Sequence, residues 1–325
     1  MTWRRWLTTA AAVAVTTLLV APPAVAADGL AITGYVGTWE GTAAVRPSLA
    51  ALTTVAVDGV GLRSDGAAVA SPDDDAQRLL AQAHAGGRRA ELLVSNYSDR
   101  LGDFSEPVAY RLLDSAAHRA AVVRQLAADV AAGWDGIHLD LESLQPRDRA
   151  GLTAFAAQLR AALPAGASLA MAVMAAGSAA GYRARGYDLP ALATSLDWVV
   201  LMAYDQHGPG WSGPGPIGGL PWTRTVLGAL LGLVPAARVD LGVAGYGYTW
   251  PAAGGGTSVS DADARAGAVG ATWDATQAEW HGTLPDGGAI WWSDRRSLQV
   301  REALATSRGL HGVAVWSLGQ SDPIR

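Results

Sequence analysis

Residues 135–142 read Asp-Gly-Ile-His-Leu-Asp-Leu-Glu, and this stretch decides both the fold and the chemistry of the chain. Side chains of a β-strand point alternately to its two faces. One face of the segment is therefore apolar, and the other carries His138, Asp140 and Glu142. Ionisable groups are costly in a buried strand unless they are paired or act in catalysis. We interpret the segment as a buried strand whose polar face lines a functional site.

The segment is one of eight short apolar runs, which are separated by Ala/Leu-rich stretches with helical periodicity. Continuous apolar strands that alternate with helices indicate a parallel sheet covered by helices. Eight such units predict an α/β fold, the closed (β/α)8 TIM barrel. An open, doubly wound sheet is the alternative, but no Gly-x-Gly-x-x-Gly motif opens a helix after the first run. The eight runs are Ala31–Trp39, Thr53–Val60, Arg89–Ser95, Gly136–Glu142, Ser168–Met174, Trp198–Tyr204, Val239–Tyr246 and Gly312–Trp316.

One long segment interrupts this rhythm, between Tyr248 and a helix expected to begin near Arg295. It is rich in glycine at Gly254–Gly256 and contains several tryptophans. We predict a small insertion between the seventh strand and its helix, at about residues 251–293. The mature chain, residues 27–325, is otherwise predicted to be a single barrel domain.

Asp140 and Glu142 lie two residues apart on one strand face, which places their Cβ atoms roughly 7 Å apart or less. Like charges at this separation keep one carboxyl protonated. Active sites of such barrels lie at the carboxyl ends of the strands, where a protonated Glu142 can donate to a leaving-group oxygen. Asp140 lies deeper and is expected to orient a substrate amide or to share a proton with His138. The alternative is a polar network that only stabilises the barrel.

The same eight residues resemble the signature Asp-Gly-x-Asp-x-Asp-x-Glu of glycoside hydrolase family 18, matched at Asp135, Gly136, Asp140 and Glu142. The resemblance extends over nearly the whole mature chain, and it is greatest to the branch of spore-cortex and cell-wall N-acetylglucosaminidases. Further segments resemble the sixth strand, the loop after it, the seventh strand and the eighth strand of the family. These segments are, in this order, Leu201–Asp205, Gln206–Trp222, Gly242–Trp250 and Gly312–Gln320.

The resemblance implies a retaining mechanism in which the substrate assists. Glu142 would protonate the glycosidic oxygen, and the substrate's own 2-acetamido oxygen would attack the anomeric carbon to give an oxazolinium intermediate. Asp140 would orient the acetamido group, and Tyr204 would donate a hydrogen bond to its oxygen. Asp205 would hydrogen-bond the sugar, and Trp316 would form the floor of the −1 subsite. The mechanism needs no metal or cofactor, and none is expected.

His138 departs from the family pattern, which usually has Asp or Asn at this position. We expect the imidazole to hydrogen-bond Asp140 and, when charged, to reduce the tendency of Asp140 to hold a proton. Activity is then expected to survive with a shifted pH profile.

Four more residues are candidates for substrate binding because they lie at or after the carboxyl ends of predicted strands. Tyr35 lies near the end of the first strand, and Asn96 follows the third. Trp211 and Trp222 lie beside the loop after the sixth strand. Asp58, in the second strand, is a further candidate for facing the site. Packing inside the barrel is the alternative for Tyr35, and indoles fill cores as well as stacking on sugars.

The first 26 residues are expected to be a secretory signal peptide. Arg4 and Arg5 precede an apolar stretch, Leu7–Val20, and Ala24–Ala26 supplies small residues for cleavage. The stretch is shorter than the roughly 20 residues that a membrane span needs, which disfavours an uncleaved anchor. The mature protein is expected to be secreted or associated with the cell wall, monomeric, and not bound to a membrane.

The composition excludes several classes of function. A formal net charge of −5 without a basic run argues against nucleic acid as a partner. The chain has no cysteine, so neither disulfides nor thiolate metal sites are available, and stability must come from the core. The histidines lack metal-ligand spacing, and no metal site is expected.

These observations predict a secreted glycosidase that cleaves β-linked polymers containing N-acetylglucosamine. Peptidoglycan or its fragments are the first substrate choice, and chitin or chitooligosaccharides are the second. A catalytically weak sugar-binding barrel is an alternative of another class, although the chain retains Glu142, Asp140 and Tyr204. A third interpretation makes Asp205 a covalent nucleophile.

Overall fold

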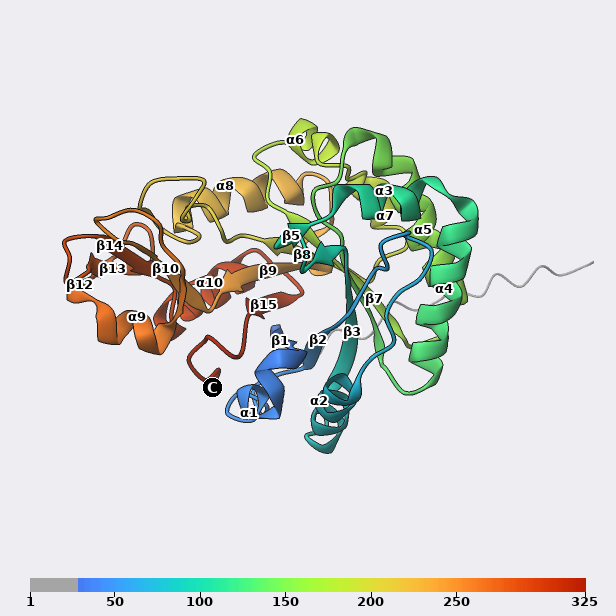
Figure 1. The fold of residues 1–325 in the computed structure, drawn as a ribbon, viewed down its shortest axis with the longest axis horizontal. Helices are drawn as coiled ribbons and strands as arrows, with labels where there is room; N and C mark the ends of the chain where they lie inside the picture. Colours follow the sequence, from blue (N-terminus) through green and yellow to red (C-terminus); the bar gives the residue numbers. More distant parts are fainter. Residues whose placement is uncertain (1–28) are drawn as a thin grey trace, which may run out of the picture.

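A computed structural model describes residues 29–325, so the expected signal peptide lies outside the described residues. Within this part of the chain, eight parallel strands close into a barrel in the order β1-β15-β9-β8-β7-β6-β3-β2 (Figure 1). The predicted TIM barrel is confirmed. The barrel strands are β1 (Ala31–Gly37), β2 (Thr54–Gly61), β3 (Arg89–Ser95), β6 (Gly136–Asp140), β7 (Ser168–Met174), β8 (Trp198–Met202), β9 (Val239–Ala244) and β15 (Gly312–Trp316).

Helices between the strands surround the barrel (Figure 1). A short hairpin, β4 (Tyr97–Ser98) with β5 (Asp103–Phe104), follows β3. The α-helices are α1 (Gly41–Val45), α2 (Asp74–Ala85), α3 (Glu106–Asp114), α4 (Ala116–Ala131), α5 (Arg149–Ala162), α6 (Ala179–Ala184), α7 (Leu189–Leu192), α8 (Leu220–Leu231), α9 (Asp261–Gly267) and α10 (Arg295–Ser307). Short 3-10 helices are η1 (Thr38–Glu40), η2 (Pro146–Asp148) and η3 (Ala236–Arg238).

Acidic side chains cap the starts of two of the longer helices. The Asp73 carboxylate accepts a hydrogen bond from the backbone N–H of Ala76 at 2.8 Å, at the start of α2. Asp294 accepts from the N–H of Arg296 at 2.9 Å, at the start of α10. These bonds satisfy N–H groups that have no partner inside the helix, and the negative charge suits the helix dipole.

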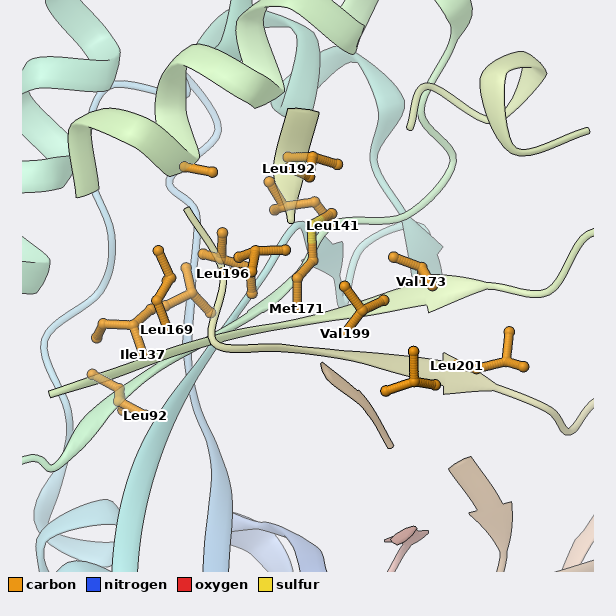
Figure 2. Close-up of a cluster of buried hydrophobic side chains, with 14 of the residues drawn as sticks. Leu92, Ile137, Leu141, Leu169, Met171, Val173, Leu192, Leu196, Val199 and Leu201 are labelled. Atoms are coloured by element: carbon orange, nitrogen blue, oxygen red, sulfur yellow. The ribbon is translucent and has the colours of Figure 1, made fainter. Parts of the chain in front are cut away.

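The main core lies between the outer face of the barrel and the helices. Figure 2 shows part of it, where Leu141 lies near Leu192 of α7 and Ile137 lies near Leu169 of β7, all within one cluster of buried side chains. Ile137 and Leu141 are fully buried, as is Leu139 between them. The apolar face of the 135–142 segment therefore faces the helix layer, as its alternation predicts.

The barrel interior combines apolar and polar side chains. A small cluster of apolar residues, including Tyr35, Leu93 and Trp198, fills part of it. Glu91 and His138 alternate with outward-facing residues of β3 and β6, and both are fully buried. Polar groups in such a place must be hydrogen-bonded to be tolerated, so their partners carry information about function.

A separate antiparallel sheet lies between β9 and α10, beside the barrel (Figure 1). Its order is β11-β10-β14-β13-β12. The sheet begins at Tyr246, whereas the sequence places the insertion at about 251–293, because the aromatic run after β9 looks like a continuation of that strand. Trp292 is buried in the insertion and stacks on Trp280, with ring centroids 6.0 Å apart. The strands are β10 (Tyr246–Trp250), β11 (Ser258–Ser260), β12 (Val269–Asp274), β13 (Glu279–Thr283) and β14 (Ala289–Trp292).

A buried ion pair joins the insertion to the barrel. Glu279 of β13 accepts a hydrogen bond from Arg301 of α10 at 2.9 Å, and both side chains are buried. The same carboxylate accepts the backbone N–H groups of Ile217 (2.6 Å) and Gly218 (2.9 Å). The loop after β8 is thereby held by residues from two other parts of the chain.

No helix within residues 29–325 is both long enough and apolar enough to cross a membrane.

Candidate active site

Glu142 lies just beyond the carboxyl end of β6, at the mouth of the barrel. The side-chain amide of Asn96 hydrogen-bonds both the backbone N–H and the backbone carbonyl of Glu142. The N–H of Glu142 donates to Asn96 Oδ1 at 2.9 Å, and Asn96 Nδ2 donates to the Glu142 carbonyl at 3.0 Å. The residue after it, Ser143, has a left-handed backbone with φ of 58°. Such conformations are uncommon for residues other than glycine and gather at functional sites.

The expectation that Asn96 contacts the sugar is corrected. Asn96 is only 1% exposed, and its remaining amide hydrogen bond goes to the Ser105 carbonyl at 3.1 Å. Its side chain has no free surface to offer a ligand. Asn96 instead positions the backbone of Glu142.

Carboxyl groups crowd the mouth of the barrel. Burial and then the charge of Asp140 raise the pKa of Glu142 to about 9. Burial and then the charge of Asp58 raise the pKa of Asp140 to about 7, and burial with the charge of Glu40 raises that of Asp58 to about 6. Within the described chain, no ion pair includes Asp58, Asp140 or Glu142. The Asp140–Glu142 pair is therefore expected to hold a proton at neutral pH, and Glu142, whose pKa is raised further, is the group placed to donate it.

Tyr204 and Asp205 follow β8 at the same mouth. Asp205 Oδ1 accepts hydrogen bonds from the hydroxyls of Tyr246 at 2.5 Å and Tyr248 at 2.9 Å. Burial raises the pKa of Asp205, while the two tyrosine hydrogen bonds act in the opposite direction. The ring of Tyr204 lies edge-on to Tyr246, with centroids 6.4 Å apart. Like Ser143, Asp205 has a left-handed backbone, with φ of 57°.

Trp316 ends β15 and is half-buried beside this group. It packs in the apolar cluster that also contains Tyr204 and Tyr246. The ring also contacts Tyr35, with centroids 5.5 Å apart. This position suits a platform for a sugar ring.

Tyr35 is a predicted substrate contact, with packing inside the barrel as the alternative, and the side chain is only 2% exposed. Its hydroxyl lies 3.0 Å from His138 Nε2, and its ring supports Trp316 from the barrel interior. The prediction of a direct sugar contact is corrected, because the side chain is buried within the barrel.

His138 is fully buried and does not hydrogen-bond Asp140, in contrast to the sequence-based expectation. Its Nε2 contacts the Tyr35 hydroxyl, and its Nδ1 lies 3.1 Å from Glu91 Oε2. The imidazole lies deeper in the barrel than Asp140, which is two residues further along β6. Its hydrogen-bond partners, Tyr35 and Glu91, belong to β1 and β3. The substrate-binding assignment of His138 is therefore also corrected.

The two tryptophans near the β8 loop have different surroundings. Trp211 is 56% exposed and lies edge-on to Tyr248, with centroids 5.7 Å apart. It is therefore close to Asp205, which accepts a hydrogen bond from Tyr248. Trp222 is half-buried in α8 and packs against the core between barrel and helices. Trp211 stays a candidate for sugar stacking, whereas the structure places Trp222 in the helix layer.

Sequence reasoning missed Glu91, Tyr246 and Tyr248. Glu91 is a lone acidic residue in an apolar strand, and this was the available signal. The two tyrosines lie in an aromatic run that gave no sign of a bend between them and β9. Across residues 29–325, no group of three or more His, Cys, Asp or Glu side chains is arranged to hold a metal ion.

Comparison with known proteins identifies the family of the chain. A sequence profile of "Glycosyl hydrolases family 18" matches residues 31–321. The chain belongs to this family. Its family 18 relatives include spore cortex-lytic enzymes and chitinases, and the chain is accordingly a glycosidase.

Two curated family 18 relatives illustrate the similarity. An uncharacterized glycosylase of Bacillus subtilis (strain 168), YvbX, is 24% identical over 248 residues, 70% of each chain. The cortical fragment-lytic enzyme of Bacillus anthracis is 28% identical over 208 residues, 59% of this chain and 48% of that one. This chain thus matches about half the length of the second relative.

Two solved family 18 structures share the fold. The spore cortex-lytic enzyme SleL of Bacillus cereus has a TM-score of 0.81 at 23% identity, and the match covers 91% of this chain and 72% of that one. A chitinase from Chromobacterium violaceum ATCC 12472 has a TM-score of 0.80 at 28% identity, covering 90% of this chain and 96% of that one.

Proposed function

We propose that this glycosidase hydrolyses β-linked polymers containing N-acetylglucosamine by a substrate-assisted retaining mechanism. The observation that carries the proposal is the pair at the end of β6. Glu142 is held at the barrel mouth by Asn96 and has a pKa raised to about 9, directly beside Asp140. A carboxylic acid that keeps its proton at neutral pH is what leaving-group protonation requires.

In this mechanism Glu142 donates its proton to the glycosidic oxygen as the bond to the anomeric carbon breaks. The 2-acetamido oxygen of the substrate bonds to that carbon, and the resulting oxazolinium is opened by water, which Glu142 deprotonates. Asp140 stabilises the positive amide nitrogen. Tyr204 donates to the acetamido oxygen, and its phenol stays protonated because burial raises its pKa. Trp316 carries the sugar ring.

Asp205 serves in sugar binding in this proposal. Both tyrosine hydrogen bonds end on its Oδ1, which restrains that oxygen and reduces its nucleophilicity. A thiazoline that mimics the oxazolinium separates the two roles. Inhibition supports substrate assistance, whereas a trapped glycosyl ester on Asp205, found by mass spectrometry, would establish a covalent nucleophile.

Peptidoglycan or its fragments are the first proposed substrate. The proposal follows from relatives named as cortex-lytic and cortical fragment-lytic enzymes. Chitin is the second, because the Chromobacterium violaceum chitinase matches this chain over almost its whole length.

Product analysis tests the proposal. Wild type and Glu142→Gln are incubated with peptidoglycan, chitin and chitooligosaccharides, and reducing ends are measured. We expect release by the wild type only, with the preferred polymer identifying the substrate. Equal release by both proteins would remove Glu142 from the mechanism. Binding of a polymer without cleavage by the wild type would favour the sugar-binding barrel.

We also propose that the first 26 residues direct export of the protein and are removed by cleavage after Ala26, and that the mature protein acts as a monomer outside the cell or at the cell wall. The basis is the arrangement of basic, apolar and small residues in the first 26 positions. Mass spectrometry of the protein from culture medium is expected to show an N-terminus at Ala27, and light scattering is expected to give the mass of one chain.

A further inference from the structure

A chain of hydrogen bonds lies below Asp140 inside the barrel, and the proposed mechanism does not use it. It connects Tyr35 of β1 to His138 of β6 at 3.0 Å and His138 to Glu91 of β3 at 3.1 Å. Glu91 and His138 have no exposed surface. A buried glutamate and a buried histidine are costly unless they compensate each other, so their presence calls for a reason.

The hydrogens in this chain can be assigned from its lower end. Arg89 donates to Ser168 Oγ at 3.1 Å, and Ser168 donates its hydroxyl hydrogen to Glu91 Oε1 at 2.6 Å. Glu91 therefore acts as an acceptor there, as an ionised carboxylate does. When Glu91 is ionised, its other oxygen, Oε2, accepts the hydrogen that Nδ1 of His138 carries, at 3.1 Å. Nε2 is the only ring atom at which His138 can gain or lose a proton.

The state of Nε2 decides where the Tyr35 hydrogen points. A bare Nε2 accepts the hydroxyl hydrogen of Tyr35, whereas a protonated Nε2 donates to the Tyr35 oxygen and releases that hydrogen for another acceptor. Asp140 is the next residue on the polar face of β6, and its Oδ1 is buried without a hydrogen-bond partner among the described residues. An ionised Asp140 thus lacks a donor, and its charge acts on the Tyr35 hydroxyl, since burial and then nearby charges, that of Asp140 among them, raise the pKa of that phenol.

We propose that the Glu91–His138 pair is a proton reservoir for Asp140, reached through the hydroxyl of Tyr35. Asp140 turns toward Tyr35 and gives its proton to the phenol oxygen, while the phenol gives its own proton to His138 Nε2. The products are an Asp140 carboxylate, a neutral Tyr35 and an imidazolium paired with the Glu91 carboxylate. The reverse transfer restores the starting state, so no proton leaves the barrel.

The surroundings of His138 suit a stored positive charge. Acidic and phenolic groups surround the imidazole, and the two basic side chains bonded to the same network, Arg89 and His311, are engaged by Ser168 at 3.1 Å and by Asp240 at 2.7 Å. Glu91, Tyr35, Asp140 and Asp240 come from four different strands, and each carboxylate offsets part of the cost of an imidazolium at this depth. Glu91 and His138 act here as positioning residues, since neither touches substrate.

The first test is the pH profile of hydrolysis, and it rests on the proposed function. Without the reservoir, Asp140 must lose its proton to solvent. We expect Glu91→Gln and Tyr35→Phe each to move the acidic limb of kcat/KM upward by roughly one pH unit, which is a tenfold change. KM stays within about twofold. Glu91→Asp, which keeps the charge, restores part of the shift, and His118→Gln on α4 leaves the profile unchanged.

A purely structural role for the pair predicts lower activity at every pH and an unmoved acidic limb. That result would overturn the reservoir.

The second test needs no activity, so it separates failure of the reservoir from failure of the proposed function. Histidine labelled with ¹⁵N is incorporated, and the His138 signals are assigned with His138→Gln. We expect the Nδ1–H tautomer, and we expect the Nε2 resonance to move in Asp140→Asn at pH 7. An Nε2–H tautomer, or an Nε2 resonance with the same chemical shift in wild type and Asp140→Asn, would contradict the proposal.

Discussion

Two glutamates with raised pKa values, Glu279 and Glu142, have opposite surroundings in this molecule. Glu279, where the insertion meets the barrel, accepts hydrogen bonds from Arg301 and from two backbone N–H groups. Glu142, at the barrel mouth, has other carboxyls as its charged neighbours. Burial raises the pKa of both, but Arg301 opposes the rise at Glu279, whereas Asp140 adds to the rise at Glu142.

The difference separates stability from chemistry. A compensated carboxylate holds elements together, and its loss should be felt in folding. A carboxyl without compensation destabilises the fold at neutral pH but keeps a proton available for transfer. A substitution at Glu142 should therefore change activity, whereas a substitution in the Glu279–Arg301 pair should change the free energy of unfolding.

The largest effect is expected for Glu142→Gln. Loss of the general acid should reduce kcat by about 10²- to 10⁴-fold, since the glutamine amide cannot donate a proton to the leaving group. Stability at pH 8 should be unchanged or higher, because a carboxyl that costs free energy is removed. A large loss of stability together with activity would show that Glu142 holds the fold.

Arg301→Met is expected to have the opposite pattern. Removal of the guanidinium leaves Glu279 buried without its cation, which costs about 3–5 kcal/mol of unfolding free energy. Denaturant titration measures this loss. Arg78→Met, which breaks an exposed ion pair with Asp75, is the matched control and should cost no more than about 1 kcal/mol. Equal effects at the two sites would contradict the comparison.

The pH dependence of stability sharpens the contrast. The folded pKa of Glu142, about 9, exceeds its ordinary value of 4.5, so the folded state holds a proton that the unfolded chain releases. The resulting stabilisation is complete below pH 4.5 and is lost as the pH rises through 9. Wild type should therefore lose more unfolding free energy than Glu142→Gln between pH 5 and pH 9. Parallel curves for the two proteins would place the raised pKa elsewhere.

The smallest effects are expected at the two tryptophans. Trp211→Ala should raise KM by about 2- to 10-fold, from loss of a stacking contact, with little change in melting temperature. Trp222→Ala should lower the melting temperature and leave KM unchanged, because its ring packs in the helix layer. An unchanged KM in Trp211→Ala would remove that ring from the substrate site.

Much of this arrangement could be predicted from local patterns. Alternation along residues 135–142 correctly separates the helix-facing leucines from the inward-facing Asp140. Glu142 follows at the strand end, where the fold places its active site. Alternation reports which face a side chain occupies, but not how deep it lies. Tyr35 and His138 point inward as expected, yet neighbouring strands cover them completely.

Hydrogen-bond partners that lie on different strands could not be predicted from the sequence. His138 pairs with Glu91, 47 positions away. The pairing depends on the register between β3 and β6, which places Leu93 opposite His138. The spacing of residues within one strand does not determine how that strand is aligned with its neighbour. The same limit explains Asn96, whose amide is used by the Glu142 backbone.

The first strand of the insertion has a consequence for recombination between barrels. Tyr246 and Tyr248 belong to β10, yet their hydroxyls hold Asp205 of the barrel. The insertion is thus not an independent module, because it carries the two hydroxyls that hold Asp205 of the proposed substrate site. A chimera joined at Gly245 inherits the donor's restraint on Asp205 as well as its surface. Successful exchange between two such enzymes should therefore require the tyrosines and the aspartate to travel together.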